Sequence, residues 1–577
     1  MKTSKNDPIV RETGKIINFL EDRGFGFVFS ESLSGQLFFH VSSIRFDPTR
    51  IVRGLHVSYI LDQTGDKPRA IDIEIAALPT PQRKPRKSTF TPQYSGPRFE
   101  FSKEHIDTFL HEIRGWKLEA KLDDVKKYFY GTPRIGDIKD GSSCYIIGRK
   151  GTGKTAIVQY LSSAAQERKF VTKLSFKNFP FNELYRQDNE KFTRPNQYIT
   201  LWKLIIYSFV CRMMSQDPAV DPLLRDKITK AFPHVDSDSL SALIGRWVAG
   251  DVGISIFGTG FSLGNWFQKK NAFSISDKVA NLEAFLQKNV GQSSYYVLFD
   301  ELDEDYKNVA ETYKGSEYID LLTSLFKAVQ DVKSIFSSPG KGVLPVVFLR
   351  DDIYDLLLDP DKNKWKDFEF DLDWPKEYIR QMLSYRLSKV IGCEDGDFDK
   401  IWYSVFSPDS IYYASQKKSA DSFTYISRST HGRPRDYIRY LQVCADMQIH
   451  RGGGAIQPDA VRDADKSYSN YLKDELLDEI HGLIPDINTI FSIISQIRKW
   501  ILSTDEFVAA YDNQYRKGAL RTKDAAFVLQ TLFYFSVVGN VAKQGAHIFR
   551  HDNPDAKLNF TEKIVIHRGL MKSLQIL

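Results

Sequence analysis

The chain has 577 residues, of which 42% are hydrophobic and 26% are charged, enough for three or four domains that each bury a core. This composition excludes a mainly disordered chain. The formal net charge of +6 is compatible with a nucleic-acid partner but is too small to indicate one by itself.

The cysteines and the N-terminus indicate a compartment. The four cysteines are far apart and lack the C-x-x-C and Cys/His spacings of metal sites: Cys144, Cys211, Cys393 and Cys444. We therefore expect a reducing cytoplasm and no zinc. Residues 1–10 contain no apolar segment of the kind that serves as a secretion signal, which agrees with a cytoplasmic protein.

Residues 12–77 are predicted to form a small all-β barrel. Two aromatic runs lie close together there, RGFGFV at 23–28 and LFFHV at 37–41. Because alternate residues of a strand share a face, four rings are expected side by side on neighbouring strands: Phe25, Phe27, Phe38 and His40. The alternative is that these aromatic residues belong to the barrel core, as we expect for Phe19 and Phe39.

The two aromatic runs, with residues 54–73, resemble the cold-shock domain family. The resemblance implies an OB-fold that binds single-stranded RNA or DNA, with bases stacked on the four rings and Arg23 beside them. The chain departs from the family at Ile17, Asn18 and Val41, where lysine, tryptophan and a further aromatic residue are usual. We therefore expect the binding to be weak.

Residues 78–98 are predicted to be a linker, because they are rich in proline, serine and basic residues. Four of the basic residues are close together: Arg83, Lys84, Arg86 and Lys87. They either extend a nucleic-acid track by contacting phosphates or only keep the linker solvated. Residues 99–130, which follow, have a helical pattern.

An ATPase core is predicted over residues 99–390, because a P-loop begins at residue 148. The turn GRKGTGKT lies between an apolar strand and a helix start, a context that disfavours a chance match. Backbone N–H groups hold phosphates in such a loop, while Lys154 neutralises them and Thr155 ligates Mg²⁺. The whole loop is expected to bind nucleotide: Gly148, Arg149, Lys150, Gly151, Thr152, Gly153, Lys154 and Thr155.

A second buried strand, YYVLFDE at 295–301, ends in two carboxylates. With a P-loop upstream, Asp300 is the predicted Walker B acid at Mg²⁺, and Glu301 is the predicted base that orients the attacking water. An exposed acidic turn is the alternative, since residues 303–305 are also acidic. The Asp-Glu pair resembles the P-loop ATPases with an additional catalytic strand, which implies ATP hydrolysis with ATP and Mg²⁺.

Further elements are expected around these two motifs. Helical stretches are predicted at 198–214, 280–290 and 318–332, and another buried strand at 344–350. Residues 247–267 carry one charge and are near the length of a membrane span, but five glycines and alternating apolar residues favour a hairpin.

Two arginines are candidates for sensing phosphate. Arg350 closes the strand 344–350, where additional-strand ATPases carry a γ-phosphate sensor; pairing with Asp351 or Asp352 is the alternative. The run THGRPRDYIR at 430–439 resembles the sensor segment of AAA+ initiator-like and STAND ATPases. That resemblance implies Arg435 at the phosphates, with Arg433 second. A proline at a helix start with solvated arginines is the alternative.

Two other arginines, Arg380 and Arg386, lie on a helical stretch after Trp374-Pro375. They are either arginine fingers that act across a subunit interface or surface charges, and the sequence does not separate these two roles.

The rest of the chain is predicted to be a helical lid over 391–470 and an α-rich, winged-helix-like domain over 471–577. Within the latter, residues 525–536 read as an apolar helix and residues 547–550 and 563–567 as strands. Such a module binds DNA or packs on its neighbours. Because no basic recognition helix is evident, packing is favoured.

The predicted fold class is therefore multidomain: a small OB barrel, an α/β P-loop ATPase with a helical lid, and a winged-helix-like region. We expect an ATP-hydrolysing switch, biased by single-stranded nucleic acid at the barrel. Its expected partners are further copies of itself and a separate effector protein, with no membrane. The STAND resemblance implies a role in phage defence or stress response. The alternatives are a remodelling or translocating ATPase, disfavoured by the lack of helicase motifs, and a module without turnover, disfavoured by Glu301.

Overall fold

A computed structural model describes residues 11–75 and 94–576, apart from 21–22, 31–32, 34, 49–50, 52–53, 65–67, 164–166, 178–195, 234–238, 250–273, 304–313, 337–341, 395, 414–417 and 523. The chain divides into two compact units, residues 1–90 and 91–577. The basic cluster at 83–87 of the predicted linker lies outside the described residues. No described helix is long and apolar enough to cross a bilayer.

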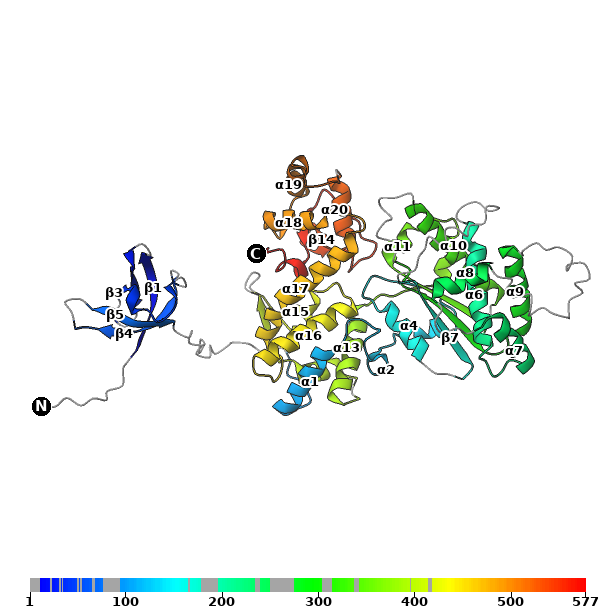
Figure 1. Ribbon diagram of the computed structural model, residues 1–577, viewed down its shortest axis with the longest axis horizontal. Helices are drawn as coiled ribbons and strands as arrows, with labels where there is room; N and C mark the ends of the chain where they lie inside the picture. Colours follow the sequence, from blue (N-terminus) through cyan, green and yellow to red (C-terminus); the bar gives the residue numbers. More distant parts are fainter. Residues whose placement is uncertain are drawn as a thin grey trace, which may run out of the picture. The chain divides into compact units, whose positions relative to one another are not determined.

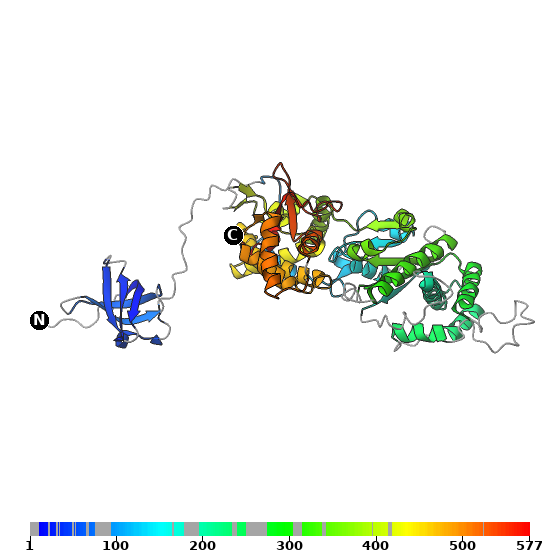
Figure 2. The same ribbon diagram turned by 90° about the horizontal axis from the view of Figure 1, so that it is seen from above.

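The first unit contains a closed five-stranded barrel, as predicted, with the strand order β1-β2-β3-β5-β4 (Figures 1 and 2). Its strands are β1 (Glu12–Leu20), β2 (Phe25–Ser30), β3 (Gly35–His40), β4 (His56–Asp62) and β5 (Arg69–Ile75). Alternate residues point inward, so that Val28, Leu37 and Phe39 are buried in one small core.

The second unit is built on a five-stranded parallel sheet with the order β10-β6-β9-β8-β7. The strands are β6 (Tyr145–Ile147), β7 (Lys169–Ser175), β8 (Ser294–Asp300), β9 (Gly342–Leu349) and β10 (Glu369–Asp371). Strand β9 lies between the P-loop strand β6 and the acid-bearing strand β8. The additional strand that the Asp-Glu pair predicted is therefore present.

Both faces of this sheet are covered by helices, which is why its three inner strands, β6, β9 and β8, are buried along almost their whole length. Tyr295, Val297 and Phe299 of β8 pack in one core, with α6, α9 and α10, while Tyr296 and Leu298 pack in the other, with α4. The helices of this part are α2 (Val125–Tyr128), α3 (Ile135–Lys139), α4 (Lys154–Ser163), α6 (Ile199–Met214), α7 (Pro222–Ala231), α8 (Leu240–Ala249), α9 (Ile275–Asn289), α10 (Lys314–Ile335), α11 (Asp351–Leu356) and α12 (Lys362–Trp365).

The expected helices at 198–214, 280–290 and 318–332 are confirmed by α6, α9 and α10. The segment 247–267 is described only at its start, where residues 247–249 are the last turn of α8. The hairpin expected for its remainder lies outside the described residues.

A third core joins the remaining helices, which gather beside the sheet (Figure 1). They are α1 (Lys103–Gly115), α13 (Lys376–Ile391), α14 (Phe398–Val405), α15 (Ser422–Ser427), α16 (Pro434–His450) and α17 (Pro458–Ile480), with the small strands β11 (Ile411–Tyr413) and β12 (Lys418–Ala420). Because α1 and α13 pack into this core, the helical part gathers segments on both sides of residue 391, where the sequence suggested a boundary.

The C-terminal residues share that third core and form three helices and a small antiparallel sheet with the order β13-β16-β14-β15. These elements are α18 (Ile487–Ile497), α19 (Thr504–Arg516), α20 (Ala525–Tyr534), β13 (Ile501–Leu502), β14 (Val538–Val541), β15 (His547–Ile548) and β16 (Lys563–Ile566). The apolar helix and the two strands expected here are present, although β15 is only two residues long.

Candidate nucleotide site and nucleic-acid interface

The P-loop connects β6 to α4 in the conformation that its glycines allow. Gly151 and Gly153 have φ angles of +83° and +101°, in the left-handed region that other residues rarely adopt. The ammonium group of Lys154 donates hydrogen bonds to the carbonyl oxygens of Gly148 (2.6 Å) and Arg149 (3.0 Å). Burial lowers the pKa of Lys154. The loop thus holds the half-buried Lys154 cation at the start of a helix.

The predicted Mg²⁺ ligands Thr155 and Asp300 meet, although they lie 145 residues apart in the sequence. The Thr155 hydroxyl donates to Oδ1 of Asp300 at 3.4 Å. Asp300 is buried, which raises its pKa. Its Oδ2 accepts no hydrogen bond from the described residues but lies 3.5 Å from Nζ of Lys173. A hydroxyl beside a carboxylate with a spare oxygen fits Mg²⁺, which prefers oxygen ligands.

The predicted base Glu301 follows Asp300 in a left-handed conformation with φ +59°, which is uncommon for this residue type. Its carboxylate accepts hydrogen bonds from Lys121 Nζ (2.7 and 2.9 Å) and from the Ser175 hydroxyl. Burial acts to raise the pKa of Glu301, but the bonds from Lys121 and Ser175 outweigh it and lower the pKa. Glu301 is therefore an ionised carboxylate at neutral pH.

Lys121 and Ser175 were not predicted from the sequence. Ser175 ends β7 and lies directly beside Asp300 in the strand register, so the sheet order would have indicated it. Lys121 lies in the loop before α2, which carries no motif. Its approach to Glu301 depends on how α1 packs on α16 and α13 and how α2 packs on α4 and α13.

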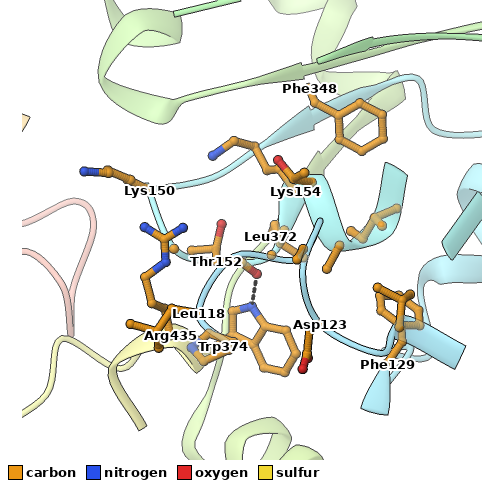
Figure 3. A pocket seen from close by; sticks show the side chains of 18 of the residues that line it. Leu118, Asp123, Phe129, Lys150, Thr152, Lys154, Phe348, Leu372, Trp374 and Arg435 are labelled. Carbon is orange, nitrogen blue, oxygen red and sulfur yellow. Dashed lines mark hydrogen bonds between the residues drawn. The ribbon is translucent and has the colours of Figure 1, made fainter. Parts of the chain in front are cut away.

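A cavity of about 230 Å³ lies at the carboxyl ends of β6, β8 and β9, the edge where parallel sheets bind their ligands. Residues 150–157 of the P-loop and helix α4 line it together with Asp300, Glu301, Arg350 and Arg435. Figure 3 shows Lys154 and Thr152 of the P-loop with Trp374 and Arg435 beside them. The predicted catalytic and P-loop residues from Lys150 to Thr155 thus share one cavity.

The structure shows the pairing of Arg350 with Asp352 that the sequence offered as one alternative, and the sensor role stays a prediction. It lines the cavity, and it also pairs with Asp352, to which Nε and Nη2 donate at 2.9 and 2.6 Å. Its Nη1 lies 3.5 Å from the carboxylate of Asp303. Burial opposes the charge, but the two carboxylates outweigh it and raise the pKa of Arg350, so the cation is permanent and its position fixed.

Residues 431–435, which we call the clamp segment, contact the P-loop closely. A Cβ added to Gly151 would lie 3.2 Å from Cβ of Arg435, so glycine is needed here for space as well as for conformation. Three hydrogen bonds join the two segments: Arg433 Nη1 to the Lys150 carbonyl (3.1 Å), the Arg435 N–H to the Gly151 carbonyl (3.4 Å), and Arg149 Nη2 to the His431 carbonyl (2.8 Å). The Trp374 indole donates to the next carbonyl, that of Thr152, at 2.8 Å (Figure 3).

The two arginines of the clamp segment differ in their surroundings. Arg433 is fully buried and pairs with Asp436 (3.0 Å) and Glu479 (2.9 Å). These ion pairs hold the guanidinium group that donates to the P-loop carbonyl of Lys150. Arg435 lines the cavity and pairs with Glu475 at 3.2 Å. Of the two, only Arg435 is placed to reach a phosphate.

Neither interpretation of Arg386, as an arginine finger across a subunit interface or as a surface charge, agrees with its position, which is buried and among the residues that line the nucleotide cavity. Its side chain is buried, pairs with Asp123 at 2.9 Å, and lies over the rings of Trp116 and Tyr128. Arg380 also pairs within the chain, with Asp399 at 2.7 Å. Moving the Arg386 cation to a neighbouring subunit would leave Asp123 without it and open this packing.

The aromatic face expected on the barrel is present. Phe25 pairs with His40 and Phe27 with Phe38 across β2 and β3. The three phenyl rings have centroids 5.6 to 6.2 Å apart and are exposed or half-buried, while His40 is exposed and bonds Ser42. We call these four rings the platform. Arg23 is exposed at the start of β2, whereas Phe39 is buried and stacks on Phe19, as predicted for core residues.

One ring was missed by the sequence analysis. Phe29 lies on the same face of β2 as Phe25 and Phe27, is 39% exposed, and pairs with Lys15 of β1. The period of two along β2 would have indicated it, since the next outward position after Phe27 is Phe29.

Two families match parts of the chain. Residues 12–76 match the "'Cold-shock' DNA-binding domain", which confirms the resemblance noted for the barrel. Residues 377–477 match the "FunZ-associated C-terminal helical domain", which covers α13 to most of α17 and contains the clamp segment.

A relative from Escherichia coli (strain K12), the transposon gamma-delta 80.3 kDa protein, is 21% identical over 451 residues. The alignment covers 73% of this chain and 61% of that protein, so the chain spans about three-fifths of the relative's length.

Several solved structures are similar at low TM-scores. One is the Aeropyrum pernix ORC1 protein in complex with DNA, which is 12% identical with a TM-score of 0.31; the match covers 82% of this chain and 92% of that chain. Another is Drosophila ORC bound to DNA, which is 10% identical with a TM-score of 0.24; the match covers 85% of this chain and 89% of that chain. The Aeropyrum pernix ORC2 protein is 12% identical with a TM-score of 0.35, and the match covers 78% of this chain and 90% of that chain.

Proposed function

We propose that this chain is a nucleic-acid-associated ATPase. The observation that carries the proposal is the meeting of the P-loop hydroxyl of Thr155 with the carboxylate of Asp300 at one cavity. Mg²⁺, when bound there, would neutralise phosphate charge. Lys154 would bind the β- and γ-phosphates, and backbone N–H groups of the loop would hold them at the N-terminus of α4.

Hydrolysis requires a group that orients water toward the γ-phosphate, and Glu301 is the carboxylate placed to do so. It lines the cavity next to Asp300 and is held by Lys121 and Ser175. Arg350 and Arg435 would stabilise the charge on the transferred phosphoryl group, since both cations line the same cavity.

The barrel would supply the nucleic-acid partner. Its exposed platform and the family match support binding of single-stranded RNA or DNA by stacking, which tolerates any base sequence. In this proposal the bound strand biases the ATPase. The winged-helix-like region would pack on its neighbours rather than bind DNA, because its apolar residues share one core with the lid helices.

The remaining parts of the proposal rest on the resemblance of residues 430–439 to STAND-type sensors. They are assembly into a homo-oligomer, a separate effector protein and a role in phage defence or stress response. A cytoplasmic location is proposed instead from the cysteines, which are all free in the structure. Measurement of the molecular mass with ADP and with a non-hydrolysable ATP analogue tests the assembly step, and an unchanged mass would contradict it.

The experiment that tests the ATPase is a pair of substitutions. Lys154→Ala should abolish binding of Mg·ATP, whereas Glu301→Gln should bind it and fail to turn it over. Lys230→Ala is the control, because Lys230 is an exposed lysine of α7 that pairs with Asp226 and does not line the cavity. Normal turnover by Glu301→Gln would remove that residue as the base.

A further inference from the structure

Three histidines, the first of which begins the clamp segment, lie close together in the fold. Neither the P-loop chemistry nor nucleic-acid binding at the barrel involves them. One ring nitrogen each of His431, His551 and His567 lies within 4.8 Å of those of the other two. The ring centroids are 4.5 to 5.0 Å apart. His431 opens the clamp segment, His551 follows β15 and His567 follows β16. The tertiary fold alone brings them together.

The surroundings of all three rings favour the neutral form. Their side chains are almost completely buried. Burial, together with the neighbouring rings and arginines, lowers the pKa of His431 and His551 far below the usual value, and burial with nearby Arg568 and Arg433 lowers that of His567 to about 3. Neutral imidazole is the form of histidine that binds metals.

Two of the buried ring nitrogens have no hydrogen-bond partner among the described residues, Nε2 of His431 and Nδ1 of His551. A buried polar atom without a partner is costly, and in folded proteins a bound ion or an ordered water often satisfies such an atom. In His567, Nδ1 accepts a hydrogen bond from the Gly569 N–H at 3.2 Å. Loss of this long bond is a small cost beside a metal–nitrogen bond.

The surroundings resemble those of ligating histidines. Nε2 of His551 lies 3.5 Å from a carboxylate oxygen of Asp552, and a carboxylate on the far side of a ring is the usual support of a metal-bound histidine. A cavity of about 940 Å³, lined by His551, His567 and Asp552, offers an entry path.

The charges near the three histidines and the nature of their ligand atoms indicate which kind of ion they would bind. Arg433 and Arg149 lie close enough to lower the pKa of His431, and the charge of Arg433 is offset by Asp436 and Glu479. No carboxylate belongs to the cluster of three. Hard ions such as Mg²⁺ and Ca²⁺ prefer carboxylate oxygens, whereas imidazole nitrogen suits Zn²⁺ and its neighbours in the periodic table.

We propose that His431, His551 and His567 bind one divalent transition-metal ion of the Zn²⁺ class. This departs from the expectation of no zinc, which was based on the cysteine spacing and could not detect histidines that only the fold brings together. The ion would tie the clamp segment, and through it the P-loop, to the C-terminal sheet. Tetrahedral Zn–N bonds of about 2.0–2.1 Å place the nitrogens about 3.4 Å apart, so the rings close by about an ångström and leave a fourth position for water.

The test begins with full-length protein stripped by a chelator and dialysed. Zn²⁺ is titrated in competition with a chromophoric chelator and with excess Mg²⁺ present, so that the Thr155–Asp300 site does not contribute to the signal. We expect one equivalent to bind. His551→Ala and His567→Ala should each weaken it by more than about 10-fold. His547→Ala is the matched control, since His547 lines the same large cavity but lies outside the cluster.

A measurement on the unsubstituted protein keeps the proposal testable if the variants fail to fold. X-ray absorption of the Zn²⁺-loaded protein should show imidazole nitrogens at about 2.0–2.1 Å and no sulfur at about 2.3 Å. The proposal is overturned if no Zn²⁺ is taken up, if sulfur is found, or if His547→Ala weakens binding as much as the cluster variants. In the first case, ordered water would satisfy the unpaired nitrogens instead.

Discussion

At the scale of single residues, the contact between Lys121 and Glu301 makes a pH prediction. The hydrogen bonds from Lys121 and Ser175 lower the pKa of Glu301, which keeps the carboxylate ionised to lower pH. Lys121→Met should therefore raise that pKa, and the acid limb of the kcat profile should move to higher pH. The measurement is ATP turnover from mildly acidic to neutral pH. Lys117→Met, at a lysine that lines the same cavity, should leave the limb in place.

Gly151 provides a second prediction. Gly151→Ala should lose nucleotide binding and about 1–2 kcal/mol of unfolding free energy, because alanine is strained at φ +83° and its Cβ would press on Arg435. Gly245→Ala should have the opposite sign, since Gly245 is an exposed glycine inside α8 where alanine stabilises by about 0.5–1 kcal/mol. Denaturant unfolding measures the unfolding free energy of both variants. Equal values for the two would contradict the close approach of the clamp segment to Gly151.

The sequence indicated those residues whose role is local. The P-loop, Asp300 and the aromatic runs each lie in a short segment whose strand, turn and helix context is legible by itself. Lys121 and the three histidines could not be predicted, because their partners come from segments far away in the chain. The burial of Arg386 also depends on tertiary packing, against Trp116 and Tyr128, so its sequence allowed a surface role that the fold excludes.

At the scale of elements, the clamp segment separates two arginines that look alike in sequence. Arg435→Ala should lower turnover with the fold intact, because its side chain lines the cavity. Arg433→Ala should instead destabilise the protein by about 3–5 kcal/mol, since it leaves Asp436 and Glu479 buried without their cation. Thermal melts and ATP turnover of both variants test this. An unfolded Arg435→Ala protein or a stable Arg433→Ala protein would reverse the assignment.

The platform on β2 and β3 makes a prediction about binding. Phe27→Ala with Phe38→Ala should weaken single-strand binding by about 2–6 kcal/mol, taking two stacked bases at about 1–3 kcal/mol each. The salt dependence should persist, because it reflects phosphate contacts rather than stacking. Phe527→Ala, at an exposed phenylalanine on α20, is the control. Titration of a labelled single-stranded nucleic acid at two salt concentrations measures the affinity and its salt dependence. Equal affinities of the double variant and the control would mean that the platform has no role in stacking.

At the scale of the whole molecule, the order of elements was predictable and the packing between them was not. The barrel, the P-loop core and the helical C-terminus follow one another as the sequence indicated. The third core, however, draws in α1 from before the P-loop and α13 from after the last strand of the sheet. Nothing local in those helices shows that they pack against α16 and its neighbours, so the lid boundary at residue 391 could not be placed from the sequence.

The central claim is that single-stranded nucleic acid bound at the barrel controls ATP turnover. Steady-state ATP hydrolysis by the full chain, with and without single-stranded RNA or DNA, tests this claim most directly. Wild type should show turnover that the strand changes, Glu301→Gln should show none, and the Phe27→Ala/Phe38→Ala protein should hydrolyse ATP at a rate that the same strand concentration leaves unchanged. Identical wild-type rates with and without a strand that binds at saturation would contradict the claim.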